Sequence, residues 1–192
     1  MGGGKGDTLR AFVALDLDST SVRRIARVSD RLRMGSGAPS ATWTPPPKMH
    51  VTLKFLGQME VDAVVPLGQS LRELAEGKPA PAPSAFRLEA FPSVQDARVV
   101  VVELVDEEKA LAKLAAKVEK LARKVGMVEE DRPYRPHVTL ARLKRPYDAR
   151  KWLRPELTEG AGLCQVTHLT LYRSELEPEG ALHVPLARFA FG

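Results

Sequence analysis

The feature that most constrains this chain is a repeated tetrapeptide, His-Val-Thr-Leu, which occurs at residues 50–53 and again at residues 137–140. Aligning the two histidines also aligns a proline four residues upstream and a leucine six residues downstream, so the likeness extends beyond the tetrapeptide. Such a repeat predicts two related halves. We therefore expect a fold with a pseudo-twofold relation, in which each half contributes one copy of the motif.

Both copies carry the alternation of a half-buried strand. Valine and leucine enter the core from one face, so the imidazole and the hydroxyl at positions i and i+2 share the other face. His50 with Thr52, and His137 with Thr139, are therefore presented to solvent or to a cleft. If a pseudo-twofold relates the halves, both pairs point into one groove.

Length and composition bound the class of protein. The 192 residues suffice for one substantial core. We predict that residues 1–8 are a flexible leader and that residues 9–192 form a single bilobed domain. Apolar runs such as residues 99–102 are far too short to span a bilayer, so no membrane segment is expected. The single cysteine, Cys164, excludes an intrachain disulfide, which favours a cytoplasmic location. We also expect the protein to be a monomer.

The order of strands and helices expected from the hydrophobic periodicity predicts an α+β fold. Hairpins are as common as crossovers in the expected order of elements, which favours mostly antiparallel sheets. The repeat adds the expectation that the two halves are pseudo-symmetric. Besides the motif strands, the pattern predicts strands near 10–17, 86–90, 98–104, 164–173 and 182–189, and helices that begin near Asp18 and cover about 64–75, 106–125 and 148–153.

A basic stretch surrounds the second motif. The formal net charge is +5, but residues 132–151 hold seven basic residues and one acidic residue, Asp148, which gives a local charge of +6. Clustered Arg and Lys attract phosphate groups and bind them. The stretch therefore favours a phosphate-rich ligand, and a solvated basic face without a ligand is the alternative.

Two histidines in one groove suit a displacement at phosphorus. The ordinary histidine pKa of ~6.5 allows one ring to be neutral and the other protonated near pH 7. The neutral ring can take a proton from an attacking water, and the protonated ring can give one to the departing oxygen. The threonines can donate hydrogen bonds to phosphate oxygens, and a nearby arginine can neutralise charge in the transition state. No metal or other cofactor is required.

Other residues offer weaker sites. Zinc usually needs three or four ligands, often closely spaced, whereas the motif histidines are 87 residues apart without a cysteine or an acid nearby. Cys164 lacks a histidine partner, so we assign it to packing. We assign His168 and His183 to the surface or to packing. Trp43 could stack on a base, but a tryptophan beside a proline run is assigned to packing.

The motifs in this setting resemble the two-histidine (2H) phosphoesterases, specifically the RNA 2′,3′-cyclic phosphodiesterases, also called 2′-5′ RNA ligases. The resemblance covers nearly the whole chain, through residues 12–15, Trp43, and residues 50–57, 135–142 and 171–174. It implies two pseudo-symmetric lobes, each with a mostly antiparallel sheet and flanking helices, and an active-site cleft between the lobes. It also implies hydrolysis of an RNA 2′,3′-cyclic phosphate to a 2′-phosphate, with the 3′ oxygen leaving, and a reverse reaction that joins RNA ends through a 2′-5′ bond.

The resemblance further implies a role for each motif residue. His50 is then the proton donor to the leaving oxygen, His137 is the base that activates water, and Thr52 and Thr139 hold the phosphate. The pseudo-symmetry by itself does not distinguish the two histidines, so these roles rest on the resemblance alone.

Three further residues are candidate substrate contacts. Arg142 matches an arginine of the family that is expected to contact phosphate. Strict alternation puts it on the face opposite His137, so it reaches the cleft only if the strand bulges or ends near Ala141. Phe55, the equivalent residue in the first copy, could offer its ring to a base, although its parity favours the core. Tyr172 is placed on the cleft side.

The implied partner is an RNA with a 2′,3′-cyclic phosphate end, such as a tRNA fragment. Two alternatives stay open. One is a phosphodiesterase for a small cyclic nucleotide or for ADP-ribose cyclic phosphate, and the basic stretch favours a polymer over such a ligand. The other is a non-catalytic RNA-end-binding module, and the intact histidine and threonine of both copies argue against it.

Overall fold

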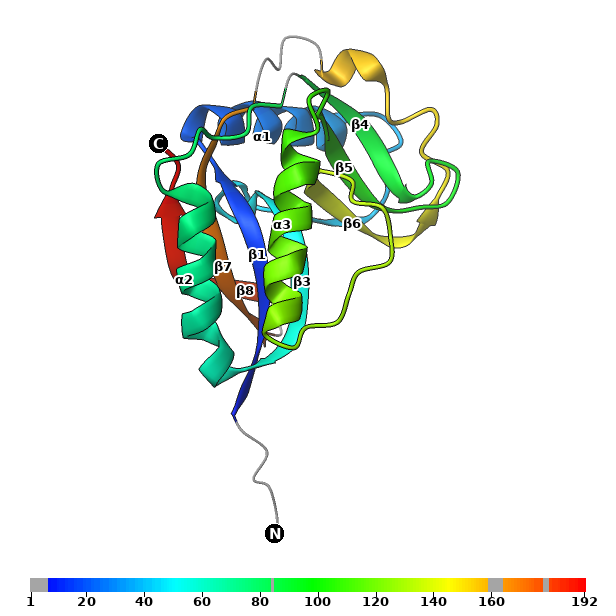
Figure 1. The fold of residues 1–192 in the computed structure, drawn as a ribbon. Coiled ribbons are helices and arrows are strands. Elements are labelled where there is room, and N and C mark those ends of the chain that lie inside the picture. The colour runs from blue at the N-terminus through cyan, green and yellow to red at the C-terminus, as the bar shows by residue number, and fades with distance from the viewer. Residues whose placement is uncertain (1–6, 84, 159–163, 178–179) are drawn as a thin grey trace.

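The computed structural model describes residues 7–83, 85–158, 164–177 and 180–192 (Figure 1). Most of the predicted leader, residues 1–8, therefore lies outside the described residues, and Thr8 already belongs to the first strand. The elements in chain order are β1 (Thr8–Leu17), α1 (Ser19–Met34), β2 (Ala41–Trp43), β3 (His50–Glu60), α2 (Val64–Ala75), β4 (Ala85–Pro92), β5 (Ala97–Val105), α3 (Ala110–Lys124), β6 (His137–Tyr147), β7 (Val166–Glu177) and β8 (Gly180–Ala190).

The described strands form one eight-stranded sheet in the order β4-β5-β6-β3-β1-β7-β8, with β2 beside β6, and every pair is antiparallel. Along their fully described lengths, β3 and β6 pair at one position, Val51 with Val138. On one side of this joint lie β3, β1, β7 and β8, and on the other lie β6, β5, β4 and β2 (Figure 1). The predicted α+β fold with antiparallel pairing is confirmed, but the sheets expected in the two lobes are continuous as one sheet, which the two motif strands join.

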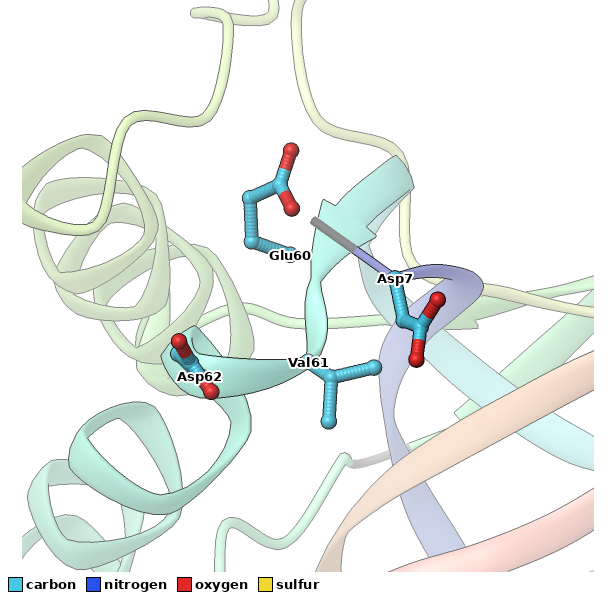
Figure 2. A pocket seen from close by; sticks show the side chains of 4 residues that line it. All are labelled: Asp7, Glu60, Val61 and Asp62. Atoms are coloured by element: carbon cyan, nitrogen blue, oxygen red, sulfur yellow. The ribbon is translucent and has the colours of Figure 1, made fainter. Parts of the chain in front are cut away.

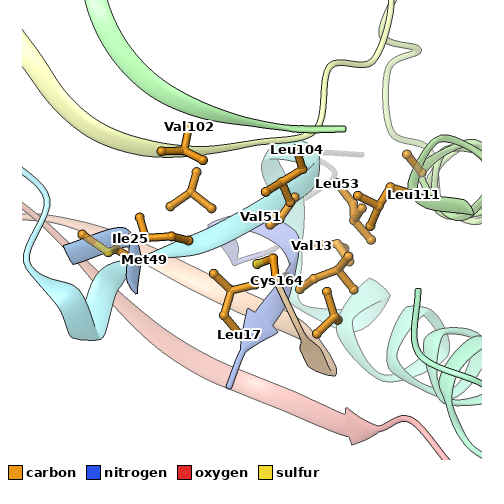
Figure 3. Packing of buried hydrophobic residues seen from close by; sticks show 14 of the residues in the cluster. Val13, Leu17, Ile25, Met49, Val51, Leu53, Val102, Leu104, Leu111 and Cys164 are labelled. Carbon is orange, nitrogen blue, oxygen red and sulfur yellow. The ribbon is translucent and has the colours of Figure 1, made fainter. Parts of the chain in front are cut away.

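The helices bury their apolar sides against one face of this sheet. Ile25 of α1, Leu71 of α2 and Leu111 of α3 are fully buried and belong to a single hydrophobic cluster. Figure 3 shows Val51 within this cluster, among apolar residues of β1 and β5. In Figure 1, α2 and α3 lie in front of the strands. Because successive side chains of a strand point to opposite faces, the neighbours of Val51 point away from the helices.

Local signals explain where the helices begin. The helix predicted to begin near Asp18 is α1, and the Oδ1 of Asp18 caps it by accepting a hydrogen bond of 2.8 Å from the backbone N–H of Ser21. The predicted helix over 64–75 is confirmed as α2 (Val64–Ala75). Within the described residues, no helix is long and apolar enough to cross a membrane.

The predicted short helix over residues 148–153 is wrong. That segment forms a turn, and the nearest helical turn is a 3-10 turn at Pro155–Thr158. Trp152 accounts for the difference because it is buried and its Nε1 donates a hydrogen bond of 3.1 Å to the carbonyl of Leu32 in α1. Tertiary contacts of this side chain therefore decide the local backbone, and the proline at 155 disfavours helix in the residue before it.

Two predicted boundaries also move. The helix predicted to start at Asp106 starts at Ala110, because Lys109 has a left-handed backbone with φ of 56°. The carboxylate of Asp106 instead accepts a hydrogen bond of 2.9 Å from the N–H of Ala112 in the first turn of α3. Cys164, predicted to open a strand, lies two residues before β7.

Candidate active site

The joint between β3 and β6 brings the two motifs together. An antiparallel pair has a local twofold axis between its partners, so the pair of Val51 with Val138 relates one motif to the other. Continuing this register by one residue sets His50 against Thr139 and His137 against Thr52. All four side chains point away from the helices, and we call the sheet surface that carries them the histidine face. The register therefore places both His-Thr pairs on the histidine face.

Both motif strands contain a bulge at the leucine of the motif. In β3, Thr52 pairs with Ala14 and Lys54 pairs with Val13, so Leu53 has no partner of its own. A bulge shifts the alternation of side chains by one residue. Lys54 therefore turns to the helix side, where it is 6% exposed and its Nζ lies 2.8 Å from a carboxylate oxygen of Glu119 in α3.

The same bulge turns Phe55 to the histidine face. Phe55 pairs with Phe12 of β1, is 61% exposed, and its ring centroid lies 6.1 Å from that of Phe12. The expectation that parity would send Phe55 to the core is wrong. Its physical reason is the unpaired Leu53, which reverses the alternation after the motif.

The bulge in β6 decides the position of Arg142. Thr139 pairs with Val101 and Ala141 pairs with Val100, which leaves Leu140 without a partner in β5. Arg142 is then set against Val99 and lies exposed on the histidine face. The bulge that the sequence requires for Arg142 to reach the site is therefore present. The two motifs also share one burial pattern over six residues, from the histidine to Phe55 or Arg142.

Backbone carbonyls fix both imidazoles in the same way. The Nδ1 of His50 lies 2.8 Å from the carbonyl oxygen of Lys48, and the Nδ1 of His137 lies 2.7 Å from that of Arg135. A carbonyl oxygen can only accept, so in each ring Nδ1 carries the hydrogen. The Nε2 atom of each neutral ring is therefore free to accept a proton, and in a protonated ring the same atom donates.

A buried carboxylate lies on the neighbouring strand opposite each histidine. Asp16 of β1 pairs with His50, is 8% exposed, and accepts hydrogen bonds from the hydroxyl of Tyr172 at 2.6 Å, from the hydroxyl of Thr170 at 3.0 Å and from Nε of Arg188 at 2.7 Å. These contacts place the Tyr172 ring on the histidine face, as predicted. They satisfy a buried charge that would otherwise be costly.

Glu103 of β5 is the counterpart of Asp16 in the second half. It pairs with His137, is also 8% exposed, and accepts hydrogen bonds from Nε of Arg135 at 2.8 Å and from Nε of Arg87 at 3.2 Å. Burial favours a higher pKa for Glu103, but the two arginines outweigh it and lower the pKa below its ordinary value. Each histidine thus stands beside a carboxylate that arginine neutralises.

The rings around the two histidines differ. His50 stacks on Phe12 with centroids 5.1 Å apart, meets His183 edge-on at 5.5 Å, and lies 6.1 Å from the ring of Tyr172. His137 meets a single ring edge-on, that of Phe91 at 4.9 Å. The first histidine therefore has an aromatic enclosure that the second lacks within the described residues.

Burial lowers the pKa of both histidines. For His50 the value falls to about 4, because burial outweighs the hydrogen bond to Lys48, and the charges of His183 and His137 act in the same direction as burial. Burial also lowers the pKa of His137 against the hydrogen bond to Arg135. Both rings are therefore neutral at pH 7 in the free protein. An anion placed between them would favour the protonated form of each.

Sequence reasoning missed four residues of this face. Asp16 and Glu103 carried a signal, since each is a lone acid at the end of a strongly apolar strand. Phe12 is 3% exposed on the histidine face, and the apolar run around it hid this position. His183 was assigned to the surface or to packing, yet it contacts the motif histidine His50. Only the pairing of β7 with β8 places it there, and its own neighbours gave no signal.

Other residues singled out from the sequence lie outside this arrangement. Trp43 packs edge-on against Trp152 with centroids 6.2 Å apart, in accord with a packing role. Cys164 is 2% exposed, and burial raises the pKa of its thiol to about 11, which makes it a poor nucleophile near pH 7. His168 is the exception in position: it pairs with Asp16 from β7 and so lies on the histidine face, but one strand further from His50 and without a ring contact to it within the described residues.

Part of the basic stretch is already neutralised within the protein. Carboxylates pair with Arg132, Arg135 and Arg150. The other four basic residues are exposed, and no ion pair in the described part of the chain involves them: Arg142, Lys144, Arg145 and Lys151. The charge available to an anionic ligand therefore follows β6 onward from the motif.

A pocket at the other end of β1 and β3 is unsuited to an anion. Figure 2 shows its lining residues, Asp7, Glu60, Val61 and Asp62. Thr8 pairs with Glu60 there, whereas Asp16 pairs with His50, so the pocket lies ten positions along β3 from His50, or roughly 30 Å of strand. Its carboxylates would repel a phosphate.

Comparison with known proteins gives concordant matches. The model of the 2′-5′ RNA ligase superfamily matches residues 14–178. The chain is 30% identical to the RNA 2′,3′-cyclic phosphodiesterase of Archaeoglobus fulgidus over 183 residues, which cover 94% of this chain and 99% of that protein. It is 28% identical to the protein of the same name from Aquifex aeolicus over 193 residues, which cover 96% and 98%.

Solved structures share the fold. The crystal structure of TT0787 of Thermus thermophilus superposes with a TM-score of 0.74 at 23% identity and covers 95% of this chain and 98% of that one. The crystal structure of Escherichia coli LigT complexed with 3′-AMP superposes with a TM-score of 0.72 at 22% identity and covers 96% and 99%. At these identities the superpositions support the architecture described above.

Proposed function

The chain belongs to the 2′-5′ RNA ligase superfamily, and from this premise we infer that it hydrolyses RNA 2′,3′-cyclic phosphate ends to 2′-phosphomonoesters by acid and base catalysis at His50 and His137. The observation that carries this proposal is the single pair between Val51 and Val138. It sets two imidazoles and two hydroxyls on one surface around a local twofold axis. A displacement at phosphorus needs a base on one side and an acid on the other, and this surface offers both.

In the proposed reaction, Nε2 of His137 takes a proton from water as the water oxygen bonds to phosphorus. The bond between phosphorus and the 3′ oxygen breaks, and Nε2–H of His50 gives its proton to that oxygen. The products are a 2′-phosphate and a 3′-hydroxyl, and the rings return to their starting forms by exchanging protons with solvent. The carbonyls that hold each Nδ1–H keep both Nε2 atoms directed at the substrate throughout.

The remaining groups of the face stabilise charge. Thr52 and Thr139 are set symmetrically about the joint and donate hydroxyl hydrogen bonds to the non-bridging phosphate oxygens. Arg142 lies exposed on the same face without an ion pair in the described part of the chain, so its guanidinium is available to the phosphate. Together they oppose the negative charge that develops in the transition state.

The low pKa of His50 fits a proton donor that is charged by its substrate. At pH 7 the free ring is neutral, since burial lowers its pKa to about 4. The phosphodiester anion favours protonation of the ring when it binds. A ring whose burial disfavours the cation then releases the proton readily to the leaving oxygen.

Exposed groups around the face provide contacts to the rest of an RNA. The Phe55 ring lies exposed beside Phe12 and offers a platform for the terminal base. The hydroxyl of Tyr172 is engaged by Asp16, so the ring rather than the hydroxyl is left to contact the substrate. The unpaired cations that follow Arg142 along β6 are suited to the upstream phosphates, and a tRNA fragment is one RNA of this kind.

Ligation through a 2′-5′ bond uses the same groups. When a 5′-hydroxyl of a second RNA replaces water, its attack on the cyclic phosphate forms a 2′-5′ bond and releases the 3′ oxygen as a hydroxyl. His137 and His50 keep their roles as base and acid. Microscopic reversibility then returns the cyclic phosphate from the 2′-5′ linkage.

The test is to incubate the purified protein, in EDTA, with a short RNA that ends in a 2′,3′-cyclic phosphate, and to read the product by phosphorus NMR. The proposal predicts complete conversion to the 2′-phosphate. A 3′-phosphate would contradict the assignment of the leaving oxygen. An unchanged cyclic phosphate despite RNA binding would favour a non-catalytic RNA-end-binding module.

A parallel assay with 2′,3′-cyclic AMP and ADP-ribose cyclic phosphate addresses the small-ligand alternative. The proposal predicts a higher kcat/KM for the RNA, with a steep fall as salt increases, because a polyanion releases several counterions on binding. Equal kcat/KM values with equal salt dependence would favour the small cyclic phosphate.

A further inference from the structure

A third histidine adjoins the motif histidine of the first half. His183 lies on β8, and its ring meets that of His50 edge-on, with centroids 5.5 Å apart and an interplanar angle of 87°. Both rings pack on Phe12, His50 by stacking at 5.1 Å and His183 by its edge at 4.9 Å. The ring of Tyr172 closes the cluster at 6.4 Å from His183. His50 is therefore held between a stacked ring and a ring edge.

The charges that face His183 come from several elements. Lys48, before β3, donates from Nζ to the carbonyl of Ala181 on β8 at 2.9 Å, and Ser174 of β7 pairs with His183 across the hairpin. On β1, Asp16 faces His50 but is engaged by Tyr172 of β7 and Arg188 of β8. The Nδ1 of His183 is buried and makes no hydrogen bond of ordinary geometry within the described residues, and the backbone of Leu182 is the polar group that favours its protonated form. Among the residues that the structure describes, no carboxylate forms an ion pair with His183.

Electrostatics couples the two rings. Burial and then the charge of Lys48 lower the pKa of His183, and the charge of His183 is among the causes that lower the pKa of His50. Two like charges at a ring separation near 5.5 Å repel in a buried site much more than in water. One proton on the pair therefore disfavours a second.

We propose that His183 is a positioning residue that acts through His50: its ring edge fixes the plane of the His50 imidazole, and a proton on His183 opposes the binding of a second proton by His50. The contact between the His50 and His183 rings rests on the geometry of the aromatic cluster. Its catalytic consequence rests on the proposed function, in which His50 must take up a proton only with the anionic substrate and then release it to the leaving oxygen. The second half has Phe91 in the equivalent contact with His137, so this coupling distinguishes the two histidines.

Proton NMR titration of the full chain tests the coupling without reference to activity. The chain has four histidines, so the Cε1–H signal of each can be assigned by single substitutions. His183→Phe keeps an aromatic edge and removes the charge. We expect the pKa of His50 to rise by about 0.5 units or more in this variant, a shift typical of losing a like charge at close range.

His168→Phe is the matched control, because His168 lies on the neighbouring β7 opposite Asp16 but does not contact the His50 ring. The control should leave the pKa of His50 unchanged. An unchanged His50 pKa in His183→Phe, or an equal shift in the control, would overturn the proposal. If His183→Phe does not fold, His183→Asn gives the second measurement, because it also removes the charge: the pKa of His50 should rise in it as well, and an unchanged value would overturn the proposal.

The pH dependence of kcat/KM connects the coupling to the reaction. In His183→Phe, the limb that reports His50 should move to higher pH by the shift that NMR measures. A lower rate at every pH with no displaced limb would show a structural role and would contradict the proposal. If the wild type has no phosphodiesterase activity, the proposed function fails, whereas the NMR shift still tests the coupling of the two rings.

Discussion

The two halves of the site share one backbone and differ in their surroundings. Each motif strand bulges at its leucine, each histidine binds the carbonyl two residues before it, and each faces a buried carboxylate on the next strand. Around His50, however, lie Phe12, Tyr172 and a further histidine, whereas His137 has Phe91 and the arginine–glutamate pair. The repeated residues thus fix the position of each imidazole, and residues outside the repeat determine how far its pKa is lowered.

The largest expected effect comes from removing either imidazole. His50→Ala and His137→Ala should each lower turnover of the cyclic phosphate by roughly two to four orders of magnitude, the usual size of general acid or base catalysis. Steady-state assays with an RNA cyclic phosphate measure this. His168→Ala is the control and should stay near the wild-type rate. Wild-type turnover in either motif variant would contradict catalysis by the two motif histidines.

The threonines test whether the symmetry extends to phosphate binding. Thr52→Val and Thr139→Val keep the shape and remove one donor each, so each should lower kcat by about 10²-fold, the lower range for a lost oxyanion donor. Similar losses would support a phosphate centred on the joint. A loss confined to one variant would mean that the phosphate sits in one half.

The pH profile should reflect the lowered pKa of both rings. The acid works only below its pKa and the base only above its own, and burial brings the pKa of His50 to about 4 and lowers that of His137. We therefore expect an optimum of kcat/KM below pH ~6.5, with a fall of about tenfold per pH unit above it. Removing one histidine should leave a single limb. An optimum well above pH 7 would contradict the burial argument.

The smallest effects should come from the cations along β6. Lys144→Ala and Arg145→Ala should weaken RNA binding modestly and lower the salt slope of log K by about one each, since each removes one phosphate contact. Fluorescence anisotropy with a labelled RNA measures both quantities. Arg87→Ala, which loses a cation already paired with Glu103, should change the slope less. Equal salt slopes of log K in all three variants would argue against RNA binding along β6.

Local patterns predicted the parts of the fold that local forces decide. The motif strands, the shared face of histidine and threonine, and α2 follow from the periodicity of their own residues. The bulges do not follow from periodicity, because the face to which each side chain after Leu53 points depends on how β3 is paired with β1. For this reason the alternation indicated the core for Phe55, a candidate substrate contact, and placed Arg142 on the site face only on condition of a bulge.

Long-range pairing explains the other gaps. His183 is 133 residues from His50 in the chain, and only the order β3-β1-β7-β8 brings its strand to the histidine face. The predicted helix over 148–153 failed because Trp152 packs under α1. A single sequence shows the periodicity of each segment, but it does not show which strands pair or which side chains pack together.

The most direct test of opposite roles for the two histidines is a substrate whose 3′ bridging oxygen is replaced by sulfur. A thiolate leaves without needing a proton, so His50→Ala should cleave this substrate at close to the wild-type rate, while His137→Ala should stay as impaired as on the ordinary RNA. Single-turnover kinetics of both variants on both substrates would measure the rescue. Rescue of His137→Ala instead of His50→Ala would reverse the assignment, and rescue of neither would contradict acid catalysis by either histidine.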